Sequence, residues 1–343
     1  MKTGLVARGE RAASAKPGSG AALLKLFSSP YNRTPASATV ADIFAADGVR
    51  LRTAQWRQPS DSIGTVVVLG GRGEFIEKYF EVIGELLARG FAVAAMDWRG
   101  QGGSERLLHN PRKGHVGRFS DYELDLDALF GEMAKQGCPK PWIGLAHSMG
   151  ATILLGAIGA GRCPLAGVVL TSPMIAIKGV KHRGRTKLAV EALCSLGLAG
   201  RFAPGGGPTS PWLSAFEGNV LTSDRTRHAR ISAFIEAHPE LTLGGPTLGW
   251  ARAAFRHVQR LEQSEWSRRR APILIVAAGA DRVVDTASAQ RLALRAAVEQ
   301  IVVIDGAEHE ILMERDVLRS QFWSAFDQFV SGSISNISQA RRS

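Results

Sequence analysis

The chain has 343 residues, of which 45% are hydrophobic and 21% are charged, so it is long enough to bury a full core. Its three cysteines, Cys138, Cys163 and Cys194, show no paired spacing, which argues against a disulfide framework and a zinc site. No stretch approaches the roughly 20 apolar residues of a membrane-spanning helix, and residues 1–20 lack the apolar segment of a secretory signal. These features favour a cytoplasmic protein, and we expect neither a cofactor nor a metal.

The net charge of +11 is concentrated in one segment. Between Thr171 and Arg270 there are 15 Lys and Arg residues against 7 Asp and Glu. A basic face attracts anionic surfaces, so peripheral contact with an anionic membrane at its inner face is one interpretation. A protein of high pI without such a partner is the other, because a charge count does not locate a patch. We expect no nucleic-acid partner, since no binding motif is present and the arginines are not interleaved with aromatic residues.

Hydrophobic periodicity predicts strands that alternate with helices. Thr39–Phe44 and Val49–Trp56, joined by a turn at Ala46-Asp47-Gly48, are predicted to form an antiparallel hairpin. Further strands are predicted at Thr65–Leu69, Phe91–Met96, Pro141–Ala146, Leu165–Leu170, Ile273–Ala277 and Ile301–Ile304. Helices with one apolar face are predicted at 80–87 and Asp121–Ala134. Further helices are predicted at Met149–Ile158, which contains small and branched residues, and at Ala287–Ala297 and Val317–Val330. This order implies an α/β fold with a mainly parallel sheet covered on both faces.

One long segment interrupts this alternation. It contains Gly205-Gly206-Gly207-Pro208, short helical patterns and many arginines, and it is predicted to be a helical cap inserted between two core strands. The Gly, Ser, Ala and Pro content of the N-terminus predicts a mobile or loosely docked extension. The expected organisation is a flexible extension (1–35), the first part of the core (36–171), the cap (172–270), the second part of the core (271–332) and a flexible tail (333–343).

The segment Trp142–Gly150 carries the clearest chemical signal. It runs from a strand through a small-residue turn into a helix, and that geometry places a nucleophilic serine, Ser148, on a sharp corner beyond the sheet. Gly150 supplies the small residue that backbone crowding requires two positions later. Ala146 stands where the usual G-x-S-x-G pattern has glycine, a change of one methyl group. The alternative is a serine in an ordinary strand-to-helix turn.

A serine hydroxyl needs a base and an orienting acid to act as a nucleophile. Asp281 follows the predicted strand at 273–277, and His309 follows the one at 301–304. Both positions lie after the carboxyl ends of parallel strands, where sites gather, and the order Ser, Asp, His is the one expected for an α/β-hydrolase. The alternatives are a surface-loop role for His309 and a helix cap for Asp281, although Asp285 is the more natural cap.

Two backbone N–H groups are predicted to form the oxyanion hole. One belongs to Met149, at the start of the helix after the nucleophile. The other belongs to Arg72, in the glycine-rich turn after Thr65–Leu69, and the alternative is that these glycines only form a tight turn. We also expect His147 to be structural and Asp97 to organise a loop.

With these residues the chain resembles the monoacylglycerol lipase and bacterial lysophospholipase group, the serine-aminopeptidase-like branch of the α/β-hydrolases. The resemblance runs from about Val40 to Val330 and is carried by 70–74 with Lys78-Tyr79, 97–104, 114–116, 119–122, 146–150, 171–174, 279–282 and 306–310. It implies hydrolysis of the carboxylic ester of a single-acyl-chain lipid, through an acyl-enzyme, with oxyanion donors at Arg72 and Met149. The chain departs from the family pattern at Ala146 and at Gly70, where a His-Gly pair is frequent, which bears on substrate preference.

The predicted function is therefore lysophospholipase-like. The first alternative is a monoacylglycerol lipase or general carboxylesterase. The second is a serine aminopeptidase, but the cap has few acidic residues that could bind the substrate amine. The third is a catalytically inactive binding module, and the intact triad argues against it. Seven apolar cap residues are candidates to line an acyl tunnel: Leu193, Leu196, Leu198, Phe202, Trp212, Leu213 and Phe216. Trp250, Phe255 and Val258 are candidates for a helical apolar face, and the alternative for both sets is that they hold the cap together. The sequence fixes neither acyl-chain length, headgroup nor oligomeric state.

Overall fold

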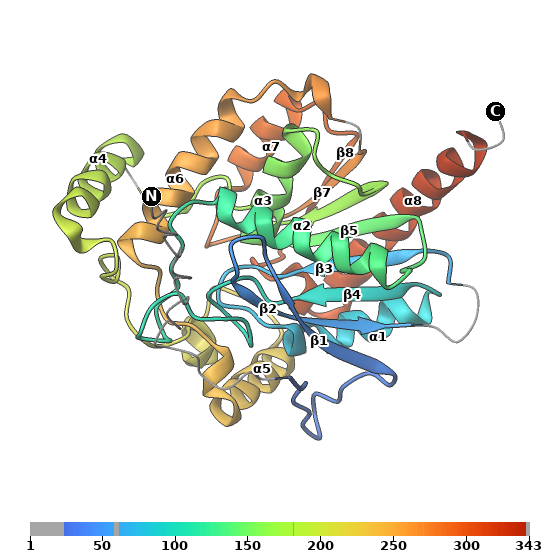
Figure 1. Cartoon of the computed structure of the whole chain (residues 1–343), viewed down its shortest axis with the longest axis horizontal. Helices are drawn as coiled ribbons and strands as arrows, with labels where there is room; N and C mark the ends of the chain where they lie inside the picture. Colours follow the sequence, from blue (N-terminus) through green and yellow to red (C-terminus); the bar gives the residue numbers. More distant parts are fainter. Residues whose placement is uncertain (1–23, 58–61, 181, 270, 341–343) are drawn as a thin grey trace, which may run out of the picture.

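The computed structural model describes residues 24–57, 62–180, 182–269 and 271–340, and its centre is an eight-stranded sheet. The strand order is β1-β2-β4-β3-β5-β6-β7-β8 (Figure 1). The antiparallel pairs join β1 (Ala38–Phe44) to β2 (Arg50–Trp56) and β2 to β4 (Ala92–Met96). The parallel pairs join β4, β3 (Thr65–Leu69), β5 (Trp142–His147), β6 (Gly167–Thr171), β7 (Ile273–Ala278) and β8 (Gln300–Ile304). The predicted α/β class with a mainly parallel sheet is confirmed.

Helices cover both faces of this sheet (Figure 1). One hydrophobic core contains residues of α2 (Ser120–Lys135), α3 (Ser148–Gly159) and α7 (Thr286–Arg295), and the opposite core contains residues of α1 (Phe80–Ala88) and α8 (Asp316–Ala340). Successive side chains of a buried strand point to opposite faces, so β3 contributes alternate residues to the two cores. The uninterrupted apolar runs of the sequence follow from this two-sided burial.

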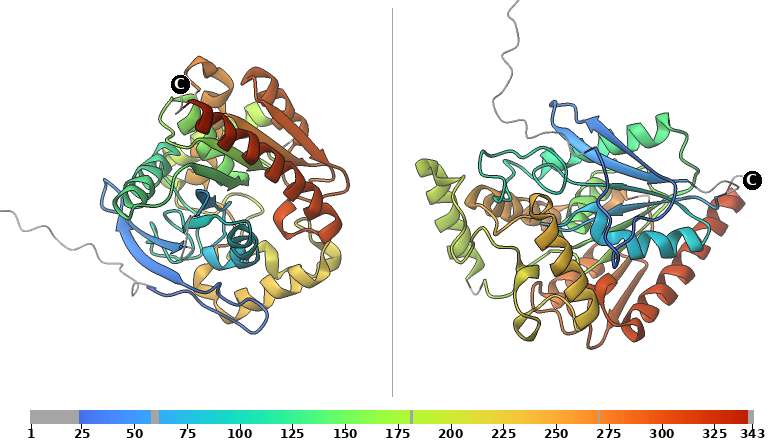
Figure 2. Two further views of the ribbon diagram at one scale, coloured as in Figure 1. Left: turned by 90° about the vertical axis from the view of Figure 1, so that its right-hand side faces the viewer. Right: turned by 90° about the horizontal axis from the view of Figure 1, so that it is seen from below.

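The segment between β6 and β7 forms helices above one end of the sheet. They are α4 (Arg183–Leu193), α5 (Arg225–Ala237) and α6 (Leu248–Gln263), of which α4 projects furthest from the core (Figures 1 and 2). The α6 helix packs against α3, where the His257 ring nitrogen Nε2 lies 3.0 Å from the carbonyl oxygen of Thr152. The cap is thus anchored to the helix that begins at Ser148.

Much of the basic excess in this segment is paired with carboxylates. Arg227 and Arg230 of α5 both bind Glu81 of α1, which fastens the cap to the core. Burial raises the pKa of Glu81, but its hydrogen bond to Arg227 and the nearby arginines outweigh that effect and lower the pKa to about 2. Further pairs are Arg225–Glu217, Arg256–Glu191 and Arg269–Glu299. The charge count therefore overstates the positive charge available to a partner.

The ends of the chain are more ordered than we expected. Residues 1–23 of the expected extension lie outside the described residues, but the part that follows docks on the core. There the Asn32 side chain donates to the Glu77 carbonyl, and the Phe27 N–H donates to the Glu77 carboxylate. At the other end α8 continues past Val330 to Ala340, so the described part of the expected tail is helical. Among the described residues, no helix combines the length and the apolar character that crossing a bilayer requires.

Candidate active site

Ser148 lies at a strained corner between β5 and α3. His147 keeps an extended conformation (φ −112°, ψ 139°), and Ser148 then adopts φ 49°, a left-handed conformation that is costly for a residue with a side chain. Such strain persists only where the surroundings enforce it, and it commonly marks a functional position. At this corner it projects the hydroxyl beyond the end of the sheet.

Gly150 lets this corner pack closely on the turn after β3. A Cβ atom at this position would lie 2.5 Å from the carbonyl oxygen of Gly70 and 2.7 Å from that of Leu69. Both atoms belong to the backbone, so no side-chain rotation relieves the collision. The requirement for a small residue here therefore has a specific cause, the approach of the β3 turn to α3.

Gly150→Ala should lower kcat on a p-nitrophenyl ester by about 10²-fold, because the added methyl separates the nucleophile from the β3 turn. The matched control is Gly131→Ala in α2, where a Cβ meets nothing within 4 Å. That variant should keep its activity and gain about 0.5–1 kcal/mol of stability, measured by thermal unfolding. Equal kcat in the two variants would contradict the proposed role of the contact.

The structure brings together the three residues selected from the sequence. The Nε2 atom of His309 lies 3.0 Å from the hydroxyl oxygen of Ser148, and its Nδ1 atom lies 2.8 Å from a carboxylate oxygen of Asp281. Asp281 and His309 follow β7 and β8, and their exposed fractions are 1% and 4%. This is the geometry of a nucleophile, a base and an orienting acid.

Asp281 is itself held by the backbone. Its second carboxylate oxygen accepts the N–H groups of Val283 and Val284, both at 2.8 Å. Burial raises the pKa of Asp281, but the His309 contact and these two amides outweigh it, so the pKa is lowered overall. The carboxylate therefore stays ionised and orients the imidazole. Asp285, which the sequence analysis favoured over Asp281 as the helix cap, directly precedes α7, and its carboxylate accepts a hydrogen bond from the Ser288 hydroxyl.

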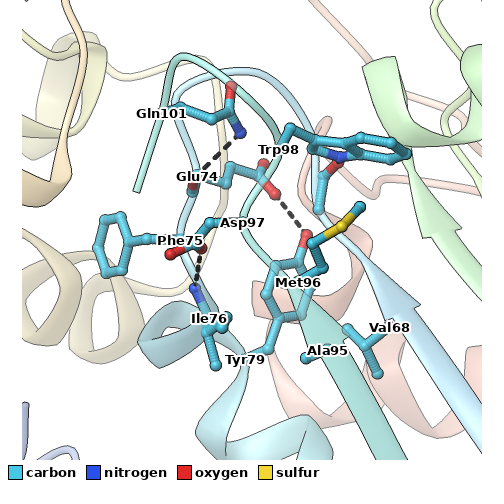
Figure 3. A pocket seen from close by; sticks show the side chains of 11 residues that line it. Val68, Glu74, Phe75, Ile76, Tyr79, Ala95, Met96, Asp97, Trp98 and Gln101 are labelled. Carbon is cyan, nitrogen blue, oxygen red and sulfur yellow. Dashed lines mark hydrogen bonds between the residues drawn. The ribbon is translucent and has the colours of Figure 1, made fainter. Parts of the chain in front are cut away.

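The turn after β3 is held by Gln101, which the sequence analysis did not select (Figure 3). Its side-chain oxygen accepts the Gly73 N–H at 3.1 Å, and its amide donates to the carbonyls of Gly71 (2.7 Å) and Glu74 (3.1 Å). The Gly71 N–H donates to the Glu74 carboxylate at 2.6 Å. The two amides that flank the Arg72 N–H are therefore both bonded within the turn.

Asp97 links the segment after β3 to the loop after β4, as expected for a residue that organises a loop. Its carboxylate accepts the N–H group of Ile76 at 2.9 Å (Figure 3). It also accepts the Gly103 N–H and the Arg52 Nε–H, both at 2.7 Å. Trp98 donates its indole N–H to the Gly70 carbonyl at 2.8 Å. The sequence signal for these roles was a run of polar residues directly after β4, at the edge of the sheet that also carries Ser148.

A buried ionic cluster lies beneath the triad. The Lys78 ammonium lies 2.8 Å from the Glu74 carboxylate and 2.5 Å from that of Glu310, and His147 Nε2 lies 3.3 Å from the same Glu310 oxygen. Burial lowers the pKa of Lys78 and of His147, but Glu310 and Glu74 outweigh it, so both values are raised. Burial raises the pKa of Glu310, yet Lys78 and His147 hold it well below its usual range. The contacts of Lys78, His147 and Glu310 therefore favour their charged forms although the three side chains are buried.

This cluster connects the three segments that form the site. Glu74 binds the turn that carries Arg72, His147 precedes Ser148, and Glu310 follows His309. The rings of His147 and His309 lie 4.9 Å apart between centroids. The cluster was not predicted, because the partners Lys78 and Glu310 are 232 residues apart.

The same cluster is the candidate metal site. Potential ligand atoms of Glu74, His147 and Glu310 lie within 4.8 Å of one another. However, the Lys78 ammonium already bonds both carboxylates. A cation would have to displace it, so the donor set fits a resident lysine better than a metal.

An apolar cavity of about 440 Å³ lies between the segment after β6 and the cap helices α4 and α6. Met174, one of its lining residues, donates its N–H to the carbonyl of Ser148 at 3.2 Å. Of the cap residues proposed for an acyl tunnel, Leu193 lines it, and the other six do not: Leu196, Leu198, Phe202, Trp212, Leu213 and Phe216. Trp212 does not, because it packs in the core beneath α5, and Leu196 is 76% exposed. Trp250, Phe255 and Val258, which were expected to form a helical apolar face, also line the cavity.

The sheet order together with the corner at Ser148 makes this chain an α/β-hydrolase. Comparison with known families is more specific, because the sequence profile of the family "Serine aminopeptidase, S33" matches residues 60–316. The chain belongs to that family, and the resemblance stated from the motifs is confirmed.

Two relatives in sequence and one solved structure are similar to this chain. Lysophospholipase L2 of Escherichia coli (strain K12) is 35% identical over 292 residues, which cover 82% of this chain and 84% of that protein. Monoacylglycerol lipase of Mycolicibacterium smegmatis is 30% identical over 271 residues, with 78% and 88% covered. A soluble variant of monoglyceride lipase from Saccharomyces cerevisiae superposes with a TM-score of 0.66 at 19% identity, covering 85% of this chain and 94% of that one, which supports the fold.

Proposed function

We propose that this chain hydrolyses carboxylic esters of single-acyl-chain lipids, with Ser148 as the nucleophile. The observation that carries the proposal is the contact of Ser148 with His309, in a chain whose cap encloses an apolar cavity of about 440 Å³. Met174, which lines this cavity, is hydrogen-bonded through its backbone to Ser148. A cavity of this size and lining is typical of sites for small apolar ligands. The names of the relatives, lysophospholipase L2 and monoacylglycerol lipase, agree with such a substrate.

The mechanism follows from the contacts. His309 accepts the proton of the Ser148 hydroxyl while the serine oxygen attacks the ester carbonyl, and Asp281 stabilises the resulting imidazolium. The N–H groups of Met149 and Arg72 hold the oxyanion. His309 then donates its proton to the departing glycerol or glycerophospho oxygen, which leaves an acyl-enzyme. Water, activated by His309, releases the fatty acid and restores Ser148.

A substrate panel tests this function. Purified protein should hydrolyse a monoacylglycerol and a lysophospholipid of the same acyl chain, and Ser148→Ala should abolish both activities. An aminoacyl p-nitroanilide in the same panel tests the peptidase alternative. A chain that cleaved only the anilide would contradict the proposal.

The residues that line the cavity argue against the serine aminopeptidase alternative. A free substrate amine needs a carboxylate partner, and the one charged residue among the described lining residues is Arg183. No acid is therefore positioned there to bind an N-terminal ammonium group.

Filling the cavity should change chain-length preference. Ala251→Trp places a large ring in the lining and should lower kcat/KM for long acyl chains relative to butyryl esters by at least about tenfold, since each buried methylene contributes about 0.8 kcal/mol. Ala192→Trp, on the exposed side of α4, is the matched control and should leave the profile unchanged. An unaltered profile in Ala251→Trp would contradict the assignment of the cavity to the acyl chain.

We further propose that α4 meets an anionic membrane surface. Leu188 of α4 is 71% exposed, and Leu196, in the segment Cys194–Leu198 that follows α4, is 76% exposed. Arg185, three residues before Leu188 in α4, is also exposed. Apolar side chains next to cations suit the interface of an anionic bilayer. Co-sedimentation with anionic vesicles at low salt should fall in Leu188→Asp/Leu196→Asp, whereas binding that is independent of vesicle charge would contradict the proposal.

A further inference from the structure

The cationic side chains of Arg72, Lys113 and Arg252 lie near Gly114 and His115, beside the turn after β3. The guanidinium of Arg72 lies against Gly114, where an added Cβ would be 3.4 Å from Nη2. Lys113 is the preceding residue. Arg252 lies one helical turn beyond Gly249, the α6 residue on which the His115 ring rests.

These cations lack carboxylate partners among the residues that the structure describes. Arg72 donates Nη2–H to the Gly244 carbonyl at 2.6 Å and lies 5.4 Å from the centre of the Trp250 ring, but its buried Nε–H has no acceptor. The buried Nε of Arg252 also has none, and Lys113 faces the Phe202 ring at 5.5 Å. In contrast, five other arginines of the cap each have a carboxylate partner: Arg225, Arg227, Arg230, Arg256 and Arg269.

The electrostatics of the cluster agree with this geometry. Burial lowers the pKa of Arg72 to about 10, so its side chain is still a cation at neutral pH. Burial also lowers the pKa of His115, and repulsion from Arg252 and Lys113 lowers it further. Partly buried cations without counter-charges are costly, and such clusters mark sites for an anion supplied by a ligand.

We propose that Arg72, Lys113 and Arg252 bind the phosphate of a glycerophospho headgroup, which makes the preferred substrate a lysophospholipid. The assignment rests on the esterase function proposed above. The backbone of Arg72 is the predicted oxyanion donor, so its guanidinium lies within one side chain of the scissile carbonyl. In a lysophospholipid the phosphate is separated from the ester oxygen only by the glycerol carbons. Arginine forms paired, charge-assisted hydrogen bonds with phosphate oxygens, and lysine adds a point charge.

The test compares two substrates with one acyl chain. For the wild type and for Arg252→Gln, Lys113→Gln and Arg72→Gln, kcat/KM is measured on decanoyl-lysophosphatidylglycerol and on 1-decanoylglycerol, both as monomers in solution. Each substitution should lower the ratio of the two values at least about tenfold, because a hydrogen bond to a charged group contributes about 1.5–3 kcal/mol. Arg72→Lys should recover part of the ratio. Arg260→Gln, which removes an exposed charge further along α6, should leave it unchanged.

The outcomes separate this proposal from the one on which it rests. Ratios that stay at the wild-type value in all three variants would overturn the phosphate site, while hydrolysis of both esters would still support the esterase. A wild type that hydrolysed neither ester would contradict the esterase itself. Inorganic phosphate is the third arm: if it inhibited glyceride hydrolysis through Arg252 while the lysophospholipid was not preferred, the ligand would be free phosphate, and the headgroup assignment would be wrong.

Discussion

Asp281→Asn should lower kcat for ester hydrolysis by about 10⁴-fold while leaving the fold intact. The structure shows why the effect is large. One oxygen of Asp281 accepts a hydrogen bond from His309 Nδ1, and the other accepts two backbone amides. An asparagine of the same shape can keep the amide contacts only by turning its NH₂ toward the imidazole. The histidine then carries its proton on Nε2, where it can no longer accept the proton of Ser148.

The matched control is Asp285→Asn in the same loop. Asp285 binds Ser288 and Arg291 and makes no contact with His309, so the loss of its charge should leave kcat near the wild-type value. Thermal unfolding of both variants checks that the loop is intact. A small effect of Asp281→Asn, or an equal effect of the two substitutions, would contradict the assignment of the acid.

Lys78→Met should destabilise the folded state by about 3–5 kcal/mol, because it removes the ammonium that bonds both buried carboxylates and leaves the His147 imidazole as their remaining cationic neighbour. The Lys78 side chain is 1% exposed, and both Glu74 and Glu310 are 5% exposed, so water cannot replace the lost partner. A fall in Tm on the order of 10 °C is expected. Activity should fall as well, since Glu74 holds the oxyanion turn and Glu310 adjoins His309.

Two further variants make this test specific. Lys135→Met removes a lysine that is 76% exposed and should change stability by less than about 0.5 kcal/mol. Adding Glu310→Gln to Lys78→Met removes one of the two stranded charges and should recover part of the stability, which a double-mutant cycle measures. A Lys78→Met protein as stable as the wild type would show that the cluster is not charged in the way described.

The triad was predictable because its signals are local. Ser148 directly follows an apolar strand, and Asp281 and His309 lie in the loops after two others; parallel strands bring such positions to one edge of the sheet. The strand runs themselves were readable because both faces of the sheet are buried. In contrast, Gln101 carries no local signal of its role, since its partners Gly71 and Gly73 lie 30 and 28 residues away.

The cap was harder to predict for physical reasons. Its charge count covered only the acids within the segment, whereas Glu81 of α1 binds both Arg227 and Arg230 of α5. Cavity linings and hydrophobic cores use the same types of apolar residue, so the sequence does not show which of the two a given cap residue joins. Trp212 therefore could not be separated from Trp250 until the packing of α5 and α6 was known.

The central claim is that Ser148 is the acylated nucleophile, and covalent labelling measures it most directly. The protein is treated with a fluorophosphonate, and the modified peptide is mapped by tandem mass spectrometry. We predict one adduct on Ser148, formed more slowly in Asp281→Asn and absent in Ser148→Ala. Labelling of another serine, or equal labelling of Ser148→Ala, would contradict the account.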